Sequence, residues 1–190
     1  MDARKAFAAK VLAQREPLVA LCSALVRAGS ENPPGDTSRV VDAIAAALAP
    51  RPRIAFERVT ARPPIVNLVA RLAFARPGRR LVFNGHLDTF PIGDARQWSA
   101  PPLAGLVRDG RIYGRGASDM KAGLAAAVLA ALLLADEEDL AGELVLALAG
   151  DEETGGTWGT RYLLDQRPET LGDAMLRGDA GPPHVVRFGE

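Results

Sequence analysis

The feature that most restricts the fold is an apolar run from Met120 to Ala135, which carries a charge only at Lys121. A helix that is apolar nearly all round has no face suited to water, so it is expected to lie buried against a sheet. Its uninterrupted part, Leu124–Ala135, is too short to span a bilayer, whose hydrocarbon core needs roughly 20 residues of helix. The run therefore predicts a core helix and not a membrane segment.

Runs typical of strands stand on both sides of this helix. Arg80–Asn84 precedes it and Glu143–Ala149 follows it, while two β-rich runs between Ile54 and Ala73 are interrupted near Pro63-Pro64. Strands that alternate with helices predict an α/β fold, a three-layer sandwich with a largely parallel mixed sheet. The other expected elements are helices over 3–28, 38–48 and up to about 164, a short hairpin over 105–113, and strands over 173–177 and 184–188.

Size and charge limit the class of protein. The chain has 190 residues, 48% of them apolar, which suffices for one core and one compact domain. Lys plus Arg and Asp plus Glu each total 23, so no basic field exists to hold nucleic acid or an anionic membrane. The single cysteine, Cys22, lies in an apolar run and is expected to be buried. No secretory signal pattern is seen at the N-terminus, and a soluble, cytoplasmic protein is expected.

Polar side chains with ligand chemistry recur where a strand gives way to a loop. They are His86 and Asp88, then Asp119, then Asp151–Glu153, and finally Asp179. In open α/β sheets the carboxyl ends of strands meet at one crevice, so these residues are expected to converge. One imidazole and several carboxylates suit zinc or a similar divalent ion, and carboxylates can bridge two ions about 3.5–4 Å apart.

Each residue also has a purely structural explanation, and taken singly these explanations are favoured. A His-x-Asp triplet such as His86 to Asp88 arises often by chance. Asp119 could cap the helix that follows it. Asp151–Glu153 could place negative charge at the positive end of a helix dipole, and Asp179 could serve a turn.

Two other chemistries are poorly supported. Gly114–Gly116 resembles a dinucleotide loop, but Asp119 stands where that fingerprint needs glycine and would repel a pyrophosphate. Ser118 lacks the context of a serine nucleophile, and only His86 and His184 could serve it as bases. His184 itself is expected to be a strand or surface residue.

Three motifs in order carry a family resemblance: Gly85–Pro91 (GHLDTFP), Gly114–Gly123 (GRGASDMKAG) and Asp151–Gly156 (DEETGG). Together they resemble the M20 metallopeptidase family, which includes acetylornithine deacetylase, succinyl-diaminopimelate desuccinylase, aminoacylase-1 and glutamate carboxypeptidase. The resemblance extends from about Asn32 to the last residue. It implies a zinc-exopeptidase-like catalytic domain, here truncated.

The resemblance implies two divalent metal ions, Zn²⁺ first, with Co²⁺ or Mn²⁺ as alternatives. Their ligands would be His86 for the first ion, Asp119 as a bridge, Glu153 for the second ion, and Asp179 to complete the first site. It also implies a cis peptide between Asp119 and Met120.

Asp88 and Glu152 match the two catalytic positions of the family. Asp88 would orient His86, and residues two apart on a strand do point the same way. Glu152 would be the general base, which takes a proton from the attacking water and returns it to the departing amine. The substrate would be an N-acyl amino acid or a small peptide.

Members of the family continue beyond the position of Glu190 into an inserted domain, which usually dimerises, and return with a late histidine for the second ion. Residues 1–190 are therefore expected to be the N-terminal part of the catalytic domain, without the inserted domain and the C-terminal catalytic segment. The chain would be a fragment or a truncated gene product, and the full-length protein could be a homodimer. The alternative is a metal-binding or structural remnant without activity.

Overall fold

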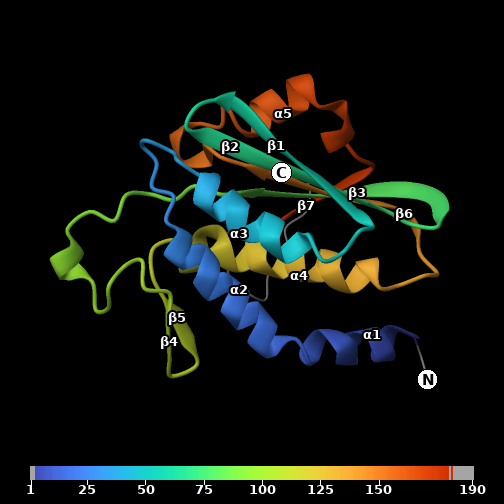
Figure 1. Cartoon of the computed structure of the whole chain (residues 1–190), viewed down its shortest axis with the longest axis horizontal. Helices are drawn as coiled ribbons and strands as arrows, with labels where there is room; N and C mark the ends of the chain where they lie inside the picture. Colours follow the sequence, from blue (N-terminus) through green and yellow to red (C-terminus); the bar gives the residue numbers. More distant parts are fainter. Residues whose placement is uncertain (1–2, 180, 182–190) are drawn as a thin grey trace.

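A five-stranded mixed sheet forms the centre of the molecule (Figure 1). The computed structural model describes residues 3–179 and 181, so the strand expected at 184–188, with His184, lies outside the described residues. Within the described part the strand order is β1-β2-β6-β3-β7. The strands are β1 (Ile54–Arg62), β2 (Ile65–Ala73), β3 (Arg76–His86), β6 (Ala141–Ala149) and β7 (Ala174–Arg177).

The sheet is parallel in one half only. β3 pairs in parallel with β6 on one side and with β7 on the other, whereas β2 pairs antiparallel with both β1 and β6. The predicted mixed sheet is confirmed, but its parallel part is the half around β3 and not most of the sheet. The carboxyl ends of β3, β6 and β7 consequently lie at one edge.

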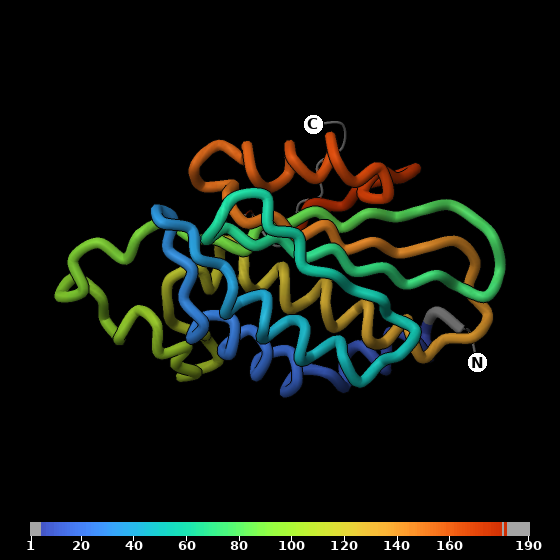
Figure 2. Tube along the Cα trace, turned by 45° about the horizontal axis from the view of Figure 1, so that its top comes forward, coloured from blue at the N-terminus to red at the C-terminus, as the bar shows by residue number. Residues whose placement is uncertain are grey.

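Helices cover both faces, which confirms the three-layer sandwich. The helices α2 (Arg15–Ala28), α3 (Ser38–Leu48) and α4 (Ala122–Ala135) lie on one side of the sheet, and α5 (Thr160–Gln166) lies on the other (Figures 1 and 2). Side chains alternate between the faces as the period of a strand requires. The face toward α3 and α4 buries Leu68, Leu72, Phe83, Leu144, Leu146 and Leu148, and the face toward α5 buries Val69, Val82, Val145 and Ala147.

The prediction of one unbroken helix over 3–28 is wrong, because two helices occupy this segment. α1 (Ala3–Leu12) and α2 are separated at Ala13 and Gln14. Pro17 stands in the first turn of α2 and has no N–H to donate to the carbonyl of Ala13, so an unbroken helix would lose a hydrogen bond there. Cys22, on α2, is buried as predicted.

The apolar helix also begins later than expected. Residues Ala117–Lys121 form a wide turn in which Asp119 and Met120 have non-helical backbone angles, and the peptide bond between these two is cis, as the resemblance implies. By length and composition Ala117–Ala135 could cross a membrane. The regular helix, however, has 14 residues, and its inner side chains are part of the main core, including Leu124 and Val128. Its apolar composition is therefore explained by packing. The expected hairpin is confirmed as β4 (Leu106–Arg108) and β5 (Arg111–Tyr113).

One close approach joins α4 to the chain after β7. A Cβ atom added at Gly123, in the first turn of α4, would lie 2.1 Å from the carbonyl oxygen of Gly178. That contact is with main chain, so it cannot be relieved by a side-chain rotation. The absence of a side chain at Gly123 thus sets how near Asp179 lies to the start of α4.

We predict that Gly123→Ala destabilises the protein by about 1–3 kcal/mol, the usual cost of overpacking. Helix propensity alone would give the opposite sign, because Ala is favoured over Gly by about 1 kcal/mol inside a helix. Urea unfolding measures the difference, with Gly181→Ala as the control, since a Cβ there meets no described atom within 4 Å. A stabilised Gly123→Ala variant would show that the main chain at Gly178 yields freely.

Candidate metal centre

The candidate residues gather at the edge where β3, β6 and β7 end. His86 is the last residue of β3, Asp151–Glu153 follow β6, and Asp179 stands two residues after β7. Asp119 reaches the same place from the wide turn before α4. Parallel strands deliver their carboxyl ends to one side of a sheet, which explains how positions so far apart in the sequence come together.

A cation-sized cluster is formed by His86, Asp119 and Asp179. The Nε2 atom of His86 lies 2.9 Å from Oδ1 of Asp119 and 3.7 Å from Oδ1 of Asp179. One ligand atom from each residue lies within 4.8 Å of the other two. The histidine is buried, whereas the two carboxylates are partly exposed, so the cluster is anchored on one side and open to solvent on the other. An imidazole nitrogen with carboxylate oxygens is a donor set that fits zinc and similar divalent ions.

The electrostatics of the cluster favour a positive charge. Burial by itself lowers the pKa of His86, but hydrogen bonds and the negative charge of Asp88, together with Asp119, outweigh it and raise the pKa to about 9. The pKa of Glu153 is raised by burial and by its negative neighbours Asp119 and Asp88, although His86 opposes this. Surplus carboxylates thus stabilise a cation at this edge, whether a proton or a metal ion.

Asp88 joins the histidine to the loop after β6. The Nδ1 atom of His86 is 3.0 Å from the main-chain oxygen of Asp88 and 3.6 Å from its carboxylate. The carboxylate itself is fully buried and accepts hydrogen bonds from Asn32 Nδ2 at 2.8 Å and from the main-chain N–H groups of Glu152 and Glu153, both at 3.1 Å. The ring is therefore contacted mainly by the carbonyl, while the carboxylate fixes the position of the two glutamates.

The adjacent glutamates point to different partners. Glu153 accepts a hydrogen bond from the main-chain N–H of Phe90 at 3.1 Å, and Glu152 accepts one from Nη2 of Arg177 at 2.8 Å. Among the described residues the cluster of close ligand atoms does not include Glu153. The structure thus brings together three of the four metal ligands that the resemblance implies, and leaves Glu153 beside them.

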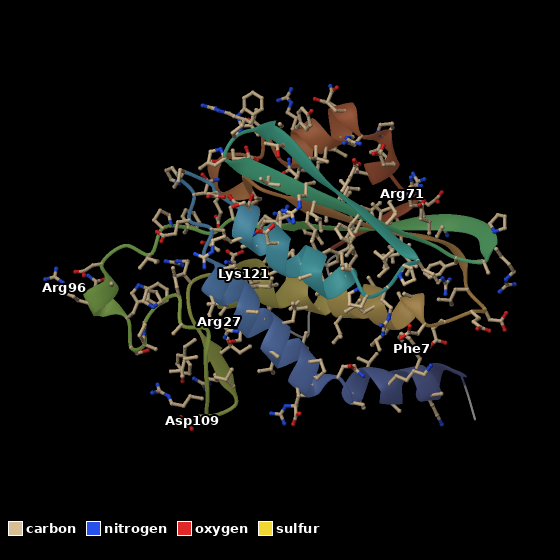
Figure 3. All side chains as sticks on the ribbon, viewed as in Figure 1. Phe7, Arg27, Arg71, Arg96, Asp109 and Lys121 are labelled. Carbon is tan, nitrogen blue, oxygen red and sulfur yellow. The ribbon has the colours of Figure 1, made fainter. Side chains whose placement is uncertain are left out.

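Three further residues belong to this region and were not singled out from the sequence. Asn32 binds Asp88, and Arg177 binds Glu152. Lys121 lies buried at the start of α4 near α2 (Figure 3), and its Nζ has no hydrogen-bond partner within the described part of the chain. Burial lowers its pKa to about 8. Lys121 is the one charged residue between Met120 and Ala135, and this position in the sequence could have identified it as a candidate site residue.

We predict that Asp88→Asn loosens the loop that carries the glutamates. The variant replaces one of the two acceptor oxygens with an NH₂ group, so at least one of the three donors that now bind the carboxylate faces another donor. A buried group left unsatisfied costs about 1–3 kcal/mol. Hydrogen exchange of the Glu152 and Glu153 amides should accelerate. Asp94→Asn is the control, because Asp94 also binds a main-chain N–H, that of Arg96, but in an exposed loop. Unchanged exchange in Asp88→Asn would contradict the assigned contacts.

Relatives that are similar to this chain in sequence include succinyl-diaminopimelate desuccinylases. The chain is 44% identical over 103 residues to succinyl-diaminopimelate desuccinylase 2 of a Ruegeria species, covering 54% of this chain and 26% of that protein. It is 42% identical over 130 residues to succinyl-diaminopimelate desuccinylase of Cereibacter sphaeroides, covering 68% of this chain and 34% of the relative. The chain thus spans about a third or less of these relatives.

Among solved structures, human carnosine dipeptidase 1 is similar in fold, with a TM-score of 0.75 and 23% identity over 93% of this chain and 41% of that one. An M20 family metallo-carboxypeptidase from Sulfolobus solfataricus gives a TM-score of 0.70 at 21% identity, over 87% of this chain and 38% of that one. The model of Peptidase family M20/M25/M40 matches residues 82–185, more than half of the chain and including His86, Asp119 and Glu153. The chain therefore belongs to Peptidase family M20/M25/M40.

Proposed function

We propose that this chain supplies a divalent-metal site to a hydrolase that cleaves the amide bond of an N-acyl amino acid or a small peptide. The observation that carries the proposal is the cluster of His86, Asp119 and Asp179, whose ligand atoms lie within 4.8 Å of one another. Relatives named as desuccinylases, and a dipeptidase of similar fold, support this class of substrate. Because the chain spans about a third or less of those desuccinylases, the activity is proposed for the whole protein.

Two ions would be held by four side chains in the proposed site. His86 and Asp179 would bind the first ion, Glu153 the second, and Asp119 would bridge them. Zinc is proposed first, with cobalt or manganese as alternatives. When bound, such ions polarise the carbonyl of the substrate and make water more acidic. The neighbouring position of Glu153, outside the three-residue cluster, is consistent with its belonging to a second ion.

Glu152 is the proposed general base. Its side chain is 38% exposed, so water and substrate can reach it, and the buried Asp88 holds its main chain in place. Glu152 would take a proton from the attacking water and give it to the departing nitrogen, which needs no covalent intermediate. The different directions of Glu152 and Glu153 support this division of labour between base and ligand.

Metal binding by this chain is the first test. His86→Ala and Asp119→Asn each remove a proposed ligand, so each should weaken Zn²⁺ binding by more than the 10- to 100-fold that the loss of an outer partner of a ligand typically costs. Isothermal titration calorimetry with ZnCl₂ measures the affinity. Asp165→Asn, an exposed carboxylate on α5, is the control for the change of charge and should bind zinc like the unaltered chain. Equal affinity in all variants would overturn the proposed site.

The adjacent glutamates give a second test, in the whole protein. Glu152→Gln should abolish turnover of N-succinyl and N-acetyl amino acids while bound metal stays unchanged, because only the base is lost. Glu153→Gln should lower the bound metal from two ions to one per protein. Metal analysis after dialysis, together with the hydrolysis assay, separates the two variants. Equal loss of metal in both would show that base and ligand are assigned the wrong way round.

A further inference from the structure

Arg177 connects two of the proposed site residues. It is the last residue of β7, which lies beside β3 at the end of the sheet as far as the chain is described. Its Nη2 atom lies 2.8 Å from Oε1 of Glu152 and 2.6 Å from Oδ2 of Asp179, and its Nε atom donates to the same Oδ2 at 2.9 Å. Two nitrogen atoms of one guanidinium thus donate to Asp179, and one of them, Nη2, also donates to Glu152.

The two oxygens of Asp179 are used differently. Oδ2 receives both hydrogen bonds from Arg177, whereas Oδ1 is turned toward Nε2 of His86, 3.7 Å away. A carboxylate in the segment after a strand can rotate about its side-chain bonds. Binding one oxygen to a guanidinium that Glu152 also holds selects the rotation that aims the other oxygen. Hydrogen-bonded partners of ligating carboxylates act in this way in metal sites generally.

We propose that Arg177 is a positioning residue that aims Oδ1 of Asp179 at the cation position beside His86 and Asp119. The inference rests on the proposed function, because it concerns the same metal site. Arg177 also draws Glu152 toward β7 and away from Glu153, which keeps the base apart from the ligand. Lysine could not replace it fully, because an ammonium lacks the planar fork of donors.

The positive charge of the Arg177 guanidinium also repels a metal cation, which would lower the metal affinity, whereas the positioning of Asp179 would raise it. Arg177 is 52% exposed, and water and salt screen the repulsion between exposed charges. Orientation of the ligand is a contact effect and is not screened in this way. The two effects have opposite signs for metal affinity, so one measurement decides between them.

The test compares Zn²⁺ affinity by calorimetry in the unaltered chain and in Arg177→Met. We expect binding to weaken about 10- to 100-fold, the usual cost of losing an outer partner of a ligand. Arg167→Met is the matched control, because Arg167 binds both oxygens of Glu57 on the surface and lies outside the cluster. It should leave the affinity unchanged. Urea unfolding of each variant shows whether the fold is retained.

A double-mutant cycle tests the route through Asp179. In an Asp179→Asn background, Arg177→Met should change the zinc affinity less than about 2-fold, because the aimed ligand is already lost. In a Glu152→Gln background the full 10- to 100-fold loss should remain. An effect that persists in Asp179→Asn, or vanishes in Glu152→Gln, would overturn the proposed route.

The remaining outcomes are also decisive. Unchanged or tighter binding in Arg177→Met overturns the inference but leaves the metal site in place if His86→Ala still weakens zinc binding as proposed above. If the unaltered chain binds no zinc, or binds it independently of His86, the proposed function and this inference both fail.

Discussion

The buried carboxylate of Asp88 is the contact on which the arrangement of the site depends. A charge removed from water is tolerated only where hydrogen-bond donors surround it. Asn32 and the main-chain N–H groups of Glu152 and Glu153 provide them, and together with the neighbouring His86 they keep the pKa of Asp88 low in spite of its burial. The need to satisfy one carboxylate therefore joins the end of β3 to two loops that are remote in the sequence.

Much of this was predictable from residue patterns. The β-rich and apolar runs identified the strands, and the apolar run from Met120 identified the central helix. The rule that the carboxyl ends of strands in an open α/β sheet meet at one crevice predicted that His86, Asp119 and Asp179 would lie close together. These predictions succeed because they depend on burial and on chain direction, and both can be inferred from the pattern of residues within a short segment. The antiparallel position of β2 between β1 and β6 follows instead from pairing between distant segments, which no local pattern records.

The same limit applies to individual side chains. Nothing near Arg177 in the sequence shows that it binds Glu152, because that contact requires the loop after β6 to lie beside the end of β7. The late start of α4 depends on the backbone angles at Asp119 and Met120, and the apolar run that begins at Met120 gives no sign of them. The break before α2 was predictable from the sequence, because Pro17 gives a local reason for it. Features that depend on a nearby residue, such as the helix break at Pro17, could thus be predicted from the sequence. Contacts between distant segments, such as that of Arg177 with Glu152, could not.

The three side chains of the cluster differ in their exposure to solvent, and this difference affects how an ion would bind and dissociate. His86 is held in the interior, but Asp119 and Asp179 are 46% and 26% exposed, so two of the three donors face solvent. Structural zinc sites enclose their ion with four protein ligands and release it only as the fold opens. An ion held by this cluster would instead exchange while the sheet stays folded. Occupancy would then follow the free metal concentration around the protein and would be reversible with a chelator.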